Sequence, residues 1–263
     1  MARDFSGTSQ YGQCSRDFSA YSTLVVAGWV YFDTKAGGGD YDMIWELTAD
    51  YGANVGSFAF YYQGTGDTMV VAHKGNVGLS AATAGTLATG VWTHWVTVYD
   101  FTVSTNEVNI YRDGALQTVD RSTGNNNNTG AFANSTFNLG GRNAASLFTD
   151  GKIERVGIWS ADIGADAIVS LSRGVDPLRV RPDKLINYWP LWGNDSPEPD
   201  YVGNNNLTIT GATQAAGPSA NRPFDGANWW PGAFTASGAA TTTPKLIGGN
   251  LIRPNLVRGR LAA

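Results

Sequence analysis

The sequence has little of several residue types on which common folds and sites depend. It contains one cysteine, Cys14, and two histidines, His73 and His94, in 263 residues, and 15% of its residues are charged. A single cysteine excludes an internal disulfide framework, so packing must supply the stability. We predict that Cys14 is a buried, inert thiol. Neither histidine has a second histidine at ligand spacing or a serine in a nucleophile-elbow context, so we expect hydrogen-bonded strand residues and no metal or base.

Long apolar runs are also absent. No segment approaches the roughly 20 apolar residues that a membrane-spanning helix needs. The N-terminal residues 1–4 lack the apolar core of a secretory signal. We therefore expect no membrane partner, no signal peptide and synthesis in a reducing cytoplasm.

Glycine and aromatic residues are plentiful instead. The chain has 33 Gly, 9 Trp, 11 Tyr and 11 Phe, a composition typical of many short strands joined by tight turns. Residues 92–98 and 108–111 carry β-forming side chains at a period of two, and Asp113-Gly114 suits the positive φ angles of a hairpin turn. This stretch predicts two or three antiparallel strands and an all-β fold.

Apolar and aromatic runs of strand length recur along the chain. We predict further strands at residues 24–32, 43–47, 57–62, 67–72, 137–142, 148–159, 185–191 and 206–212. Residues 75–90 are small and glycine-rich, which indicates a loop with one strand near its middle. One helix follows Trp159, with Ser160 or Asp162 as its cap, and it ends at Gly174.

The C-terminal part differs from the rest in charge and composition. Residues 226–263 hold four of the 18 basic residues and none of the 22 acidic ones, so residues 1–225 hold 14 basic and 22 acidic residues. An acidic body therefore carries a basic tail. The tail is rich in Gly, Ala, Pro and Thr and contains three pentads that each begin with two aliphatic residues. We predict an extended arm over residues 216–263.

Four motifs resemble a known family when taken in order. They are Gly90-x-Trp-Thr-His with Val96, Tyr111-x-Asp-Gly-x-Leu116, the 148–159 strand with Ile153 and Trp159, and the helix that ends at Gly174. Together they are similar to laminin-G-like, concanavalin A-like domains. The segment 185–191, followed by 205–212, also resembles a signature of this family, although many relatives carry it at the start of the domain. The resemblance covers about residues 20–212 and implies an antiparallel two-sheet jelly-roll sandwich, for which we predict a domain over residues 1–215.

Because this superfamily includes glucanases, the acidic residues are the candidates for a catalytic pair. Glycoside hydrolysis uses two carboxyl groups on either side of the scissile bond, and the family's Glu-x-Asp-x-x-Glu strand motif is absent. Asp40, Asp42 and Glu46 form the nearest cluster. Asp40 and Asp42 share a face but precede the apolar strand in a glycine-led turn, and we interpret them as solvated turn acids. We therefore expect no enzymatic activity.

Ligand binding leaves three alternatives open. Related domains bind calcium through Asp and Asn oxygens at the sheet rim. Asp33, Asp100 and Asp150 follow predicted strands, where they could act as calcium ligands. Apart from calcium, we expect no cofactor. Sugar binding would use aromatic side chains that stack on pyranose rings. The acidic body argues against a nucleic-acid partner, although the basic tail alone could contact phosphates weakly.

The resemblance extends to a biological setting. The position of the 185–191 signature and the basic tail resemble versions of this domain in bacteriophage structural proteins. We predict a non-enzymatic virion protein, decorating a capsid or a tail, that contacts other virion proteins and copies of itself; the alternative is a lectin-like module that binds host-surface glycans. The anchoring residues that we predict are Trp229, Trp230, Leu246, Ile247, Leu251, Ile252, Arg253, Leu256, Val257, Arg258 and Arg260.

Overall fold

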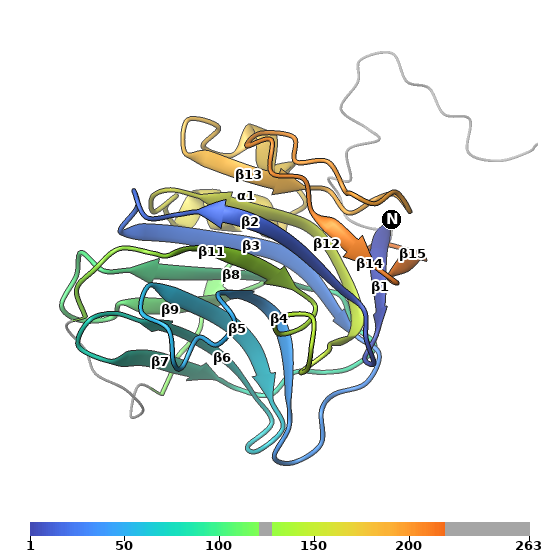
Figure 1. Cartoon of the computed structure of the whole chain (residues 1–263), viewed down its shortest axis with the longest axis horizontal. Helices are drawn as coiled ribbons and strands as arrows, with labels where there is room; N and C mark the ends of the chain where they lie inside the picture. The colour runs from blue at the N-terminus through green and yellow to red at the C-terminus, as the bar shows by residue number, and fades with distance from the viewer. Residues whose placement is uncertain (121–127, 219–263) are drawn as a thin grey trace, which may run out of the picture. The chain divides into compact units, whose positions relative to one another are not determined.

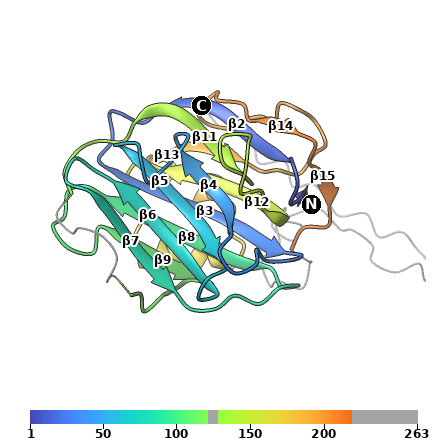
Figure 2. The ribbon, with the colours of Figure 1, turned by 60° about the horizontal axis from the view of Figure 1, so that its bottom comes forward.

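The computed structural model describes residues 1–120 and 128–218. By backbone contacts the chain divides into Met1–Trp229 and Trp230–Ala263, and the fold described below belongs to the first unit. Two antiparallel sheets pack face to face, as Figure 2 shows, with one short helix. The predicted all-β jelly-roll sandwich is confirmed.

The front sheet has seven strands (Figure 1). In spatial order they are β14 (Thr208–Thr210), β2 (Tyr11–Asp17), β11 (Asn134–Leu139), β4 (Tyr41–Leu47), β5 (Ser57–Gln63), β6 (Thr68–Lys74) and β7 (Leu79–Ala84). All their pairings are antiparallel. Strand β7 lies in the middle of the glycine-rich segment 75–90, as predicted.

The back sheet has eight strands. In spatial order they are β10 (Ala115–Leu116), β9 (Val108–Arg112), β8 (Thr93–Asp100), β3 (Thr23–Phe32), β12 (Asp150–Trp159), β1 (Ala2–Ser6) and β15 (Thr213–Ala215), and β13 (Leu185–Trp189) also pairs with β12. The turn between β9 and β10 places Asp113 and Gly114 at φ values of 49° and 86°, both positive as a two-residue hairpin loop requires.

Strand β3 is apolar throughout because both of its faces are covered. Leu24 and Val26 point between the sheets, whereas Val25 and Ala27 lie on the outer side. There they pack with Ile168 and Leu171 of helix α1 (Ala165–Ser172). The helix is preceded by Gly164 and has no side-chain cap, so the predicted cap at Ser160 or Asp162 is wrong. A 3-10 turn, η1 (Pro177–Arg179), follows the helix.

Three strands of the fold, β1, β2 and β15, are missing from the sequence-based prediction. Strands β1 and β2 are polar, yet β1 pairs with β12 and β15, and β2 pairs with β11 and β14. Arg3 in β1 is fully buried, and its Nη2 lies 2.9 Å from Glu198 Oε2. Arg3 and Glu198 are 195 positions apart, so their pairing leaves no local pattern in the sequence, and the sequence of β1 resembles a polar loop.

No helix in residues 1–120 and 128–218 is long and apolar enough to cross a membrane.

Cys14 lies in β2 with 8% of its surface exposed. Burial, with a smaller effect of Asp200, raises the pKa of its thiol to about 12. Because the thiolate is the reactive form, we expect native Cys14 to react with a maleimide at pH 8 at least about 1,000-fold more slowly than in denaturant. Mass spectrometry of time points follows the labelling, and similar rates in both states would contradict the prediction.

Candidate functional site

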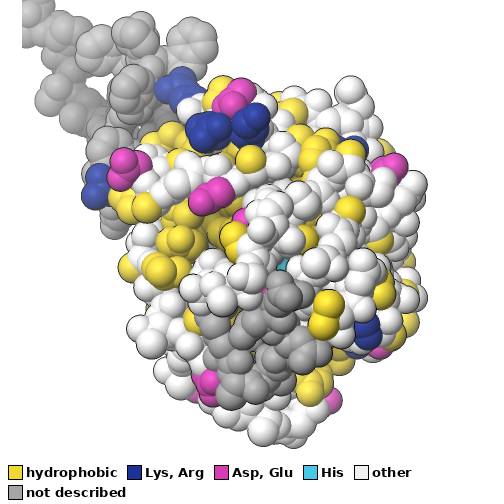
Figure 3. Space-filling view, turned by 90° about the vertical axis from the view of Figure 1, so that its left-hand side faces the viewer, with side chains coloured by type: hydrophobic (Ala, Val, Ile, Leu, Met, Phe, Trp, Pro, Cys, Tyr) yellow, Lys and Arg dark blue, Asp and Glu magenta, His cyan; other side chains and the backbone are white. Residues whose placement is uncertain are grey.

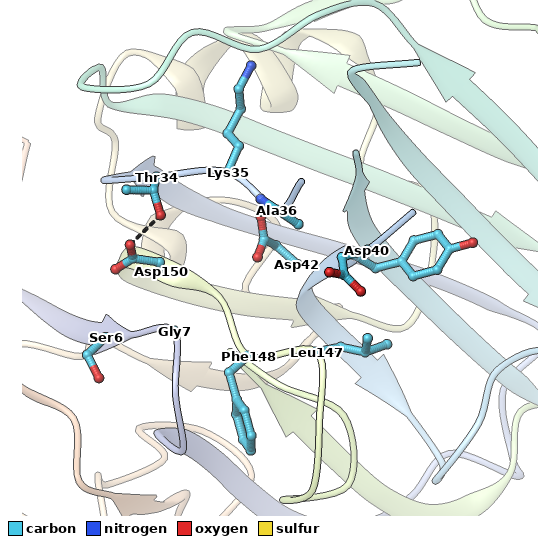
Figure 4. A pocket seen from close by; sticks show the side chains of 11 residues that line it. Ser6, Gly7, Thr34, Lys35, Ala36, Asp40, Asp42, Leu147, Phe148 and Asp150 are labelled. Carbon is cyan, nitrogen blue, oxygen red and sulfur yellow. Dashed lines mark hydrogen bonds between the residues drawn. The ribbon is translucent and has the colours of Figure 1, made fainter. Parts of the chain in front are cut away.

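A polar pocket of about 340 Å³ opens at one end of the sandwich, and we call it the rim pocket (Figure 4). Three separate stretches of the chain form it: the end of β1, the segment from the end of β3 into β4, and the segment that leads into β12. Its lining residues are Ser6, Gly7, Thr34, Lys35, Ala36, Asp40, Tyr41, Asp42, Leu147, Phe148 and Asp150.

Backbone hydrogen bonds hold these three stretches together. Met43 N donates to Leu147 O at 2.9 Å, and Gly7 N donates to Thr149 O at 3.1 Å. Gly7 has a φ of 72°, and a Cβ atom there would lie 2.8 Å from Asp150 Cβ. The turn after β1 therefore needs glycine, both for its left-handed conformation and for its close approach to Asp150.

Three carboxylates line the pocket in different environments. Asp40 is exposed, and Asp150 accepts a hydrogen bond from Thr34 Oγ1. Asp42 is 4% exposed, and its Oδ2 accepts from Ala36 N at 2.7 Å. The interpretation of Asp42 as a solvated turn acid is therefore wrong, because β4 carries it into the sheet and the segment before β12 covers it.

Burial raises the pKa of Asp42 to about 6, and the negative charges of Asp150 and Asp40 add to the rise, against the hydrogen bond from Ala36. The folded protein thus binds this proton more tightly than the unfolded chain. The resulting stabilisation is full below about pH 4 and is lost as the pH rises through about 6. Above that pH the protein carries a buried, ionised carboxylate.

We expect Asp42→Asn to raise the free energy of unfolding at pH 8 by about 1–3 kcal/mol, because it removes this buried charge. At pH 4.5, where Asp42 is largely protonated, the gain should nearly vanish. Urea unfolding at both pH values measures the difference, with Asp166→Asn, an exposed acid of α1 outside the pocket lining, as the matched control. An equal effect of Asp42→Asn at both pH values would contradict the raised pKa that we assign to Asp42.

Tyr41 and Leu147 extend the pocket onto the outer face of the front sheet, where both pack against an apolar cluster. Ring centroids of Tyr41 and Tyr61 are 5.5 Å apart, and those of Tyr51 and Tyr61 are 5.1 Å apart. Tyr51 OH donates to Tyr61 OH at 2.7 Å. Aromatic side chains therefore run from the pocket along this face.

Glu46, which the sequence places in the predicted strand 43–47, lies on the same outer face and is fully buried. Its Oε1 accepts from Tyr51 N at 2.7 Å, and its Oε2 lies 3.1 Å from Arg142 Nε. Burial raises the pKa of Glu46, although Arg142 acts in the opposite direction. Both carboxylate oxygens have partners within the protein, which indicates a structural ion pair.

The two histidines are buried strand residues, as predicted. His94, in β8, packs its ring 4.7 Å from Trp29. His73 Nε2 lies 3.0 Å from Glu107 Oε2, and Ser80 Oγ donates to the same oxygen at 2.6 Å. Since the single serine proton goes to Glu107, Ser80 is not poised to pass it to His73, and burial lowers the pKa of His73. This group does not form a nucleophile and base pair.

The three calcium candidates do not come together. Asp33 directly follows β3 and pairs with Lys152, and its N donates to Asp150 O. Asp100 pairs with Thr23 at the other end of β3, about 30 Å away for a strand of this length. Within residues 1–120 and 128–218, no group of three or more His, Cys, Asp or Glu residues is arranged to hold a metal ion.

The predicted anchoring arm, from Trp229 to Arg260, lies outside the described residues. The side of the molecule shown in Figure 3 carries acidic and basic side chains scattered among uncharged ones. The sequence-based prediction overlooked the pocket residues Thr34, Tyr41, Leu147 and Phe148. Phe148 did stand in the family motif, but nothing in that motif distinguishes a pocket residue from a scaffold residue.

Sequence comparison identifies one family. Residues 6–169 match the concanavalin A-like lectin/glucanases superfamily. No curated protein sequence matches the chain.

Solved structures share the fold at low sequence identity. One is a proposed carbohydrate-binding protein from Bacteroides ovatus ATCC 8483, with a TM-score of 0.58 and 19% identity; the alignment covers 81% of this chain and 58% of that protein. Another is the native heptameric SAP-like pentraxin from Limulus polyphemus, with a TM-score of 0.52, 11% identity, and coverage of 79% of this chain and 93% of the pentraxin. The chain thus spans little more than half the length of the Bacteroides protein.

Proposed function

Because the chain belongs to the concanavalin A-like lectin/glucanases superfamily, we propose that it is a non-catalytic carbohydrate-binding module whose rim pocket holds a glycan. The Bacteroides ovatus protein, which shares the fold and is itself described as a proposed carbohydrate-binding protein, supports this proposal. The observation that carries the proposal is the combination of carboxylates, hydroxyls and aromatic rings in one pocket.

The chemistry of the lining suits a sugar. Asp40, Asp42 and Asp150 offer carboxylate oxygens as acceptors for sugar hydroxyl groups. Tyr41 and Phe148 offer ring surface to the apolar C–H face of a pyranose. A volume of about 340 Å³ lies in the range of small-molecule sites, which is enough for one or two sugar units.

A glycan array probed with the purified protein tests the proposal. We expect binding to at least one glycan class, weakened at least about tenfold by Phe148→Ala or by the exposed Asp40→Ala. Trp192→Ala is the matched control, because Trp192 is 36% exposed and lies outside the pocket lining. Absence of binding to every glycan, or equal loss in the control, would overturn the proposal.

The same carboxylates support a second candidate function, glycoside hydrolysis. A carboxyl group whose pKa is raised to about 6 beside two other carboxylates is the arrangement that a general acid requires. Release of reducing ends from a bound oligosaccharide, abolished by Asp42→Asn, would establish the hydrolase and replace the non-catalytic proposal. The absence of such release from a glycan that binds would exclude it.

The role in a bacteriophage particle stays a prediction from the sequence, together with the virion location and the contacts with virion proteins and other copies. Deletion of residues 240–263 tests it by incorporation into particles. We expect the deletion to abolish incorporation, and undiminished incorporation would contradict the anchoring role.

A further inference from the structure

The charges that line the rim pocket have no counter-ion within it. Among the described lining residues Lys35 is the only cation, but its Nζ lies 2.6 Å from Asp67 Oδ1 and donates to Leu87 O at 2.8 Å. Figure 4 shows the Lys35 side chain directed away from Asp42 and Asp150. Asp40, Asp42 and Asp150 therefore share the pocket without a neutralising side chain.

One cation outside the lining, in the same strand as Asp150, also has partners of its own. Lys152, next along β12 from the pocket, pairs with Asp33 and lies 3.9 Å from Asp4 Oδ1. Its Nζ also lies 4.5 Å from the centroid of the Tyr31 ring. These contacts hold Lys152 on the outer face of the back sheet, and Lys152 is not among the residues that line the pocket.

Asp42 shows most directly what the pocket lacks. It is 4% exposed, and one of its oxygens, Oδ2, is held by Ala36 N. The other oxygen, Oδ1, accepts no hydrogen bond from the described residues, and Asp42 is one of the residues that line the pocket. Because the Asp42 side chain is largely buried, its ionised form is costly, and a cationic donor at Oδ1 would offset that cost best.

We infer that the rim pocket selects glycans that carry a protonated amino group, such as glucosamine units, over neutral and anionic glycans. The inference rests on the proposed function and specifies its ligand class. An ammonium group would supply the donor that Asp42 Oδ1 lacks and the positive charge that the three carboxylates lack. A uronic or sialic acid would bring a further negative charge and is disfavoured.

Isothermal titration at pH 7 with oligomers of equal length tests the inference. The series comprises a glucosamine oligomer, its N-acetylated form, a neutral glucose oligomer and a galacturonate oligomer. We expect the glucosamine oligomer to bind at least about tenfold more tightly than the N-acetylated form. Asp42→Asn should reduce this ratio to below about threefold, and Asp150→Asn should reduce it as well.

Asp166→Asn is the control, because Asp166 is an exposed acid in the first turn of α1, away from the pocket. It removes the same charge from the protein and should leave the preference intact, which separates the pocket from general attraction to an acidic surface. Neutral glycans that bind as tightly as the glucosamine oligomer, or a preference that survives Asp42→Asn, would overturn the inference and leave the proposed function standing. Absence of binding to the whole series would count against both.

Discussion

Glu198→Gln is expected to lower the free energy of unfolding by about 3 kcal/mol or more. Arg3 is fully buried, its Nη2 lies 2.9 Å from Glu198 Oε2, and it also donates to Asp195 O. Glu198 Oε1 accepts from Leu191 N at 2.8 Å. Glutamine keeps the shape but removes the counter-charge, so the variant leaves a buried guanidinium without a partner charge. The pair joins β1 to the segment after β13, and its loss should loosen both.

An exposed ion pair provides the control for this prediction. Arg181 and Asp183 lie 3.1 Å apart, but their side chains are 43% and 58% exposed. Water and salt screen such a pair, so Asp183→Asn should have a much smaller effect. Urea unfolding of both variants at pH 7 makes the comparison. Equal losses of stability would contradict the inference that burial decides the strength of the Arg3–Glu198 pair.

Trp45→Ala should lower the free energy of unfolding by about 3–5 kcal/mol, since it empties a large volume between the sheets. Trp45 is fully buried, and its ring centroid lies 4.8 Å from that of Phe60. Its Nε1 donates to Tyr99 OH at 3.1 Å, which connects the front sheet to β8 of the back sheet. The substitution therefore removes both core packing and a hydrogen bond between the sheets.

Trp192→Ala is the matched control for the same chemical change at a surface position. Trp192 is 36% exposed, so its removal should cost about 1 kcal/mol or less. Denaturant midpoints of the two variants, followed by circular dichroism, give the comparison. A loss for Trp45→Ala no larger than that for Trp192→Ala would mean that Trp45 is not part of the packed core.

The fold was predictable where local patterns carry it. The apolar run in β3 reflects a strand that is covered on both faces. The Asp113-Gly114 turn reflects two residues with positive φ angles. Strands β1 and β2 were not predictable in the same way. Arg3 is a core residue only because Glu198 reaches it, and neither residue signals the other in the sequence.

The rim pocket lies beyond local sequence patterns for the same reason. Asp42 becomes a buried acid only when the segment with Leu147 and Phe148 closes over the start of β4. The sequence did identify Asp150 as a rim acid, but it grouped Asp150 with Asp100, which lies at the other end of the sandwich. Which acids share a site is decided by strand register, and register depends on the whole sheet.

Amide chemical-shift mapping with a glycan that the array identifies tests the central claim most directly. If the rim pocket is the binding site, the largest shifts on titration will fall in residues 34–42 and 147–150 and will saturate together. Asp42→Asn should weaken the titration without unfolding the protein. Saturable shifts concentrated elsewhere, such as around Thr23 and Asp100 at the opposite end of the sandwich, would contradict the claim.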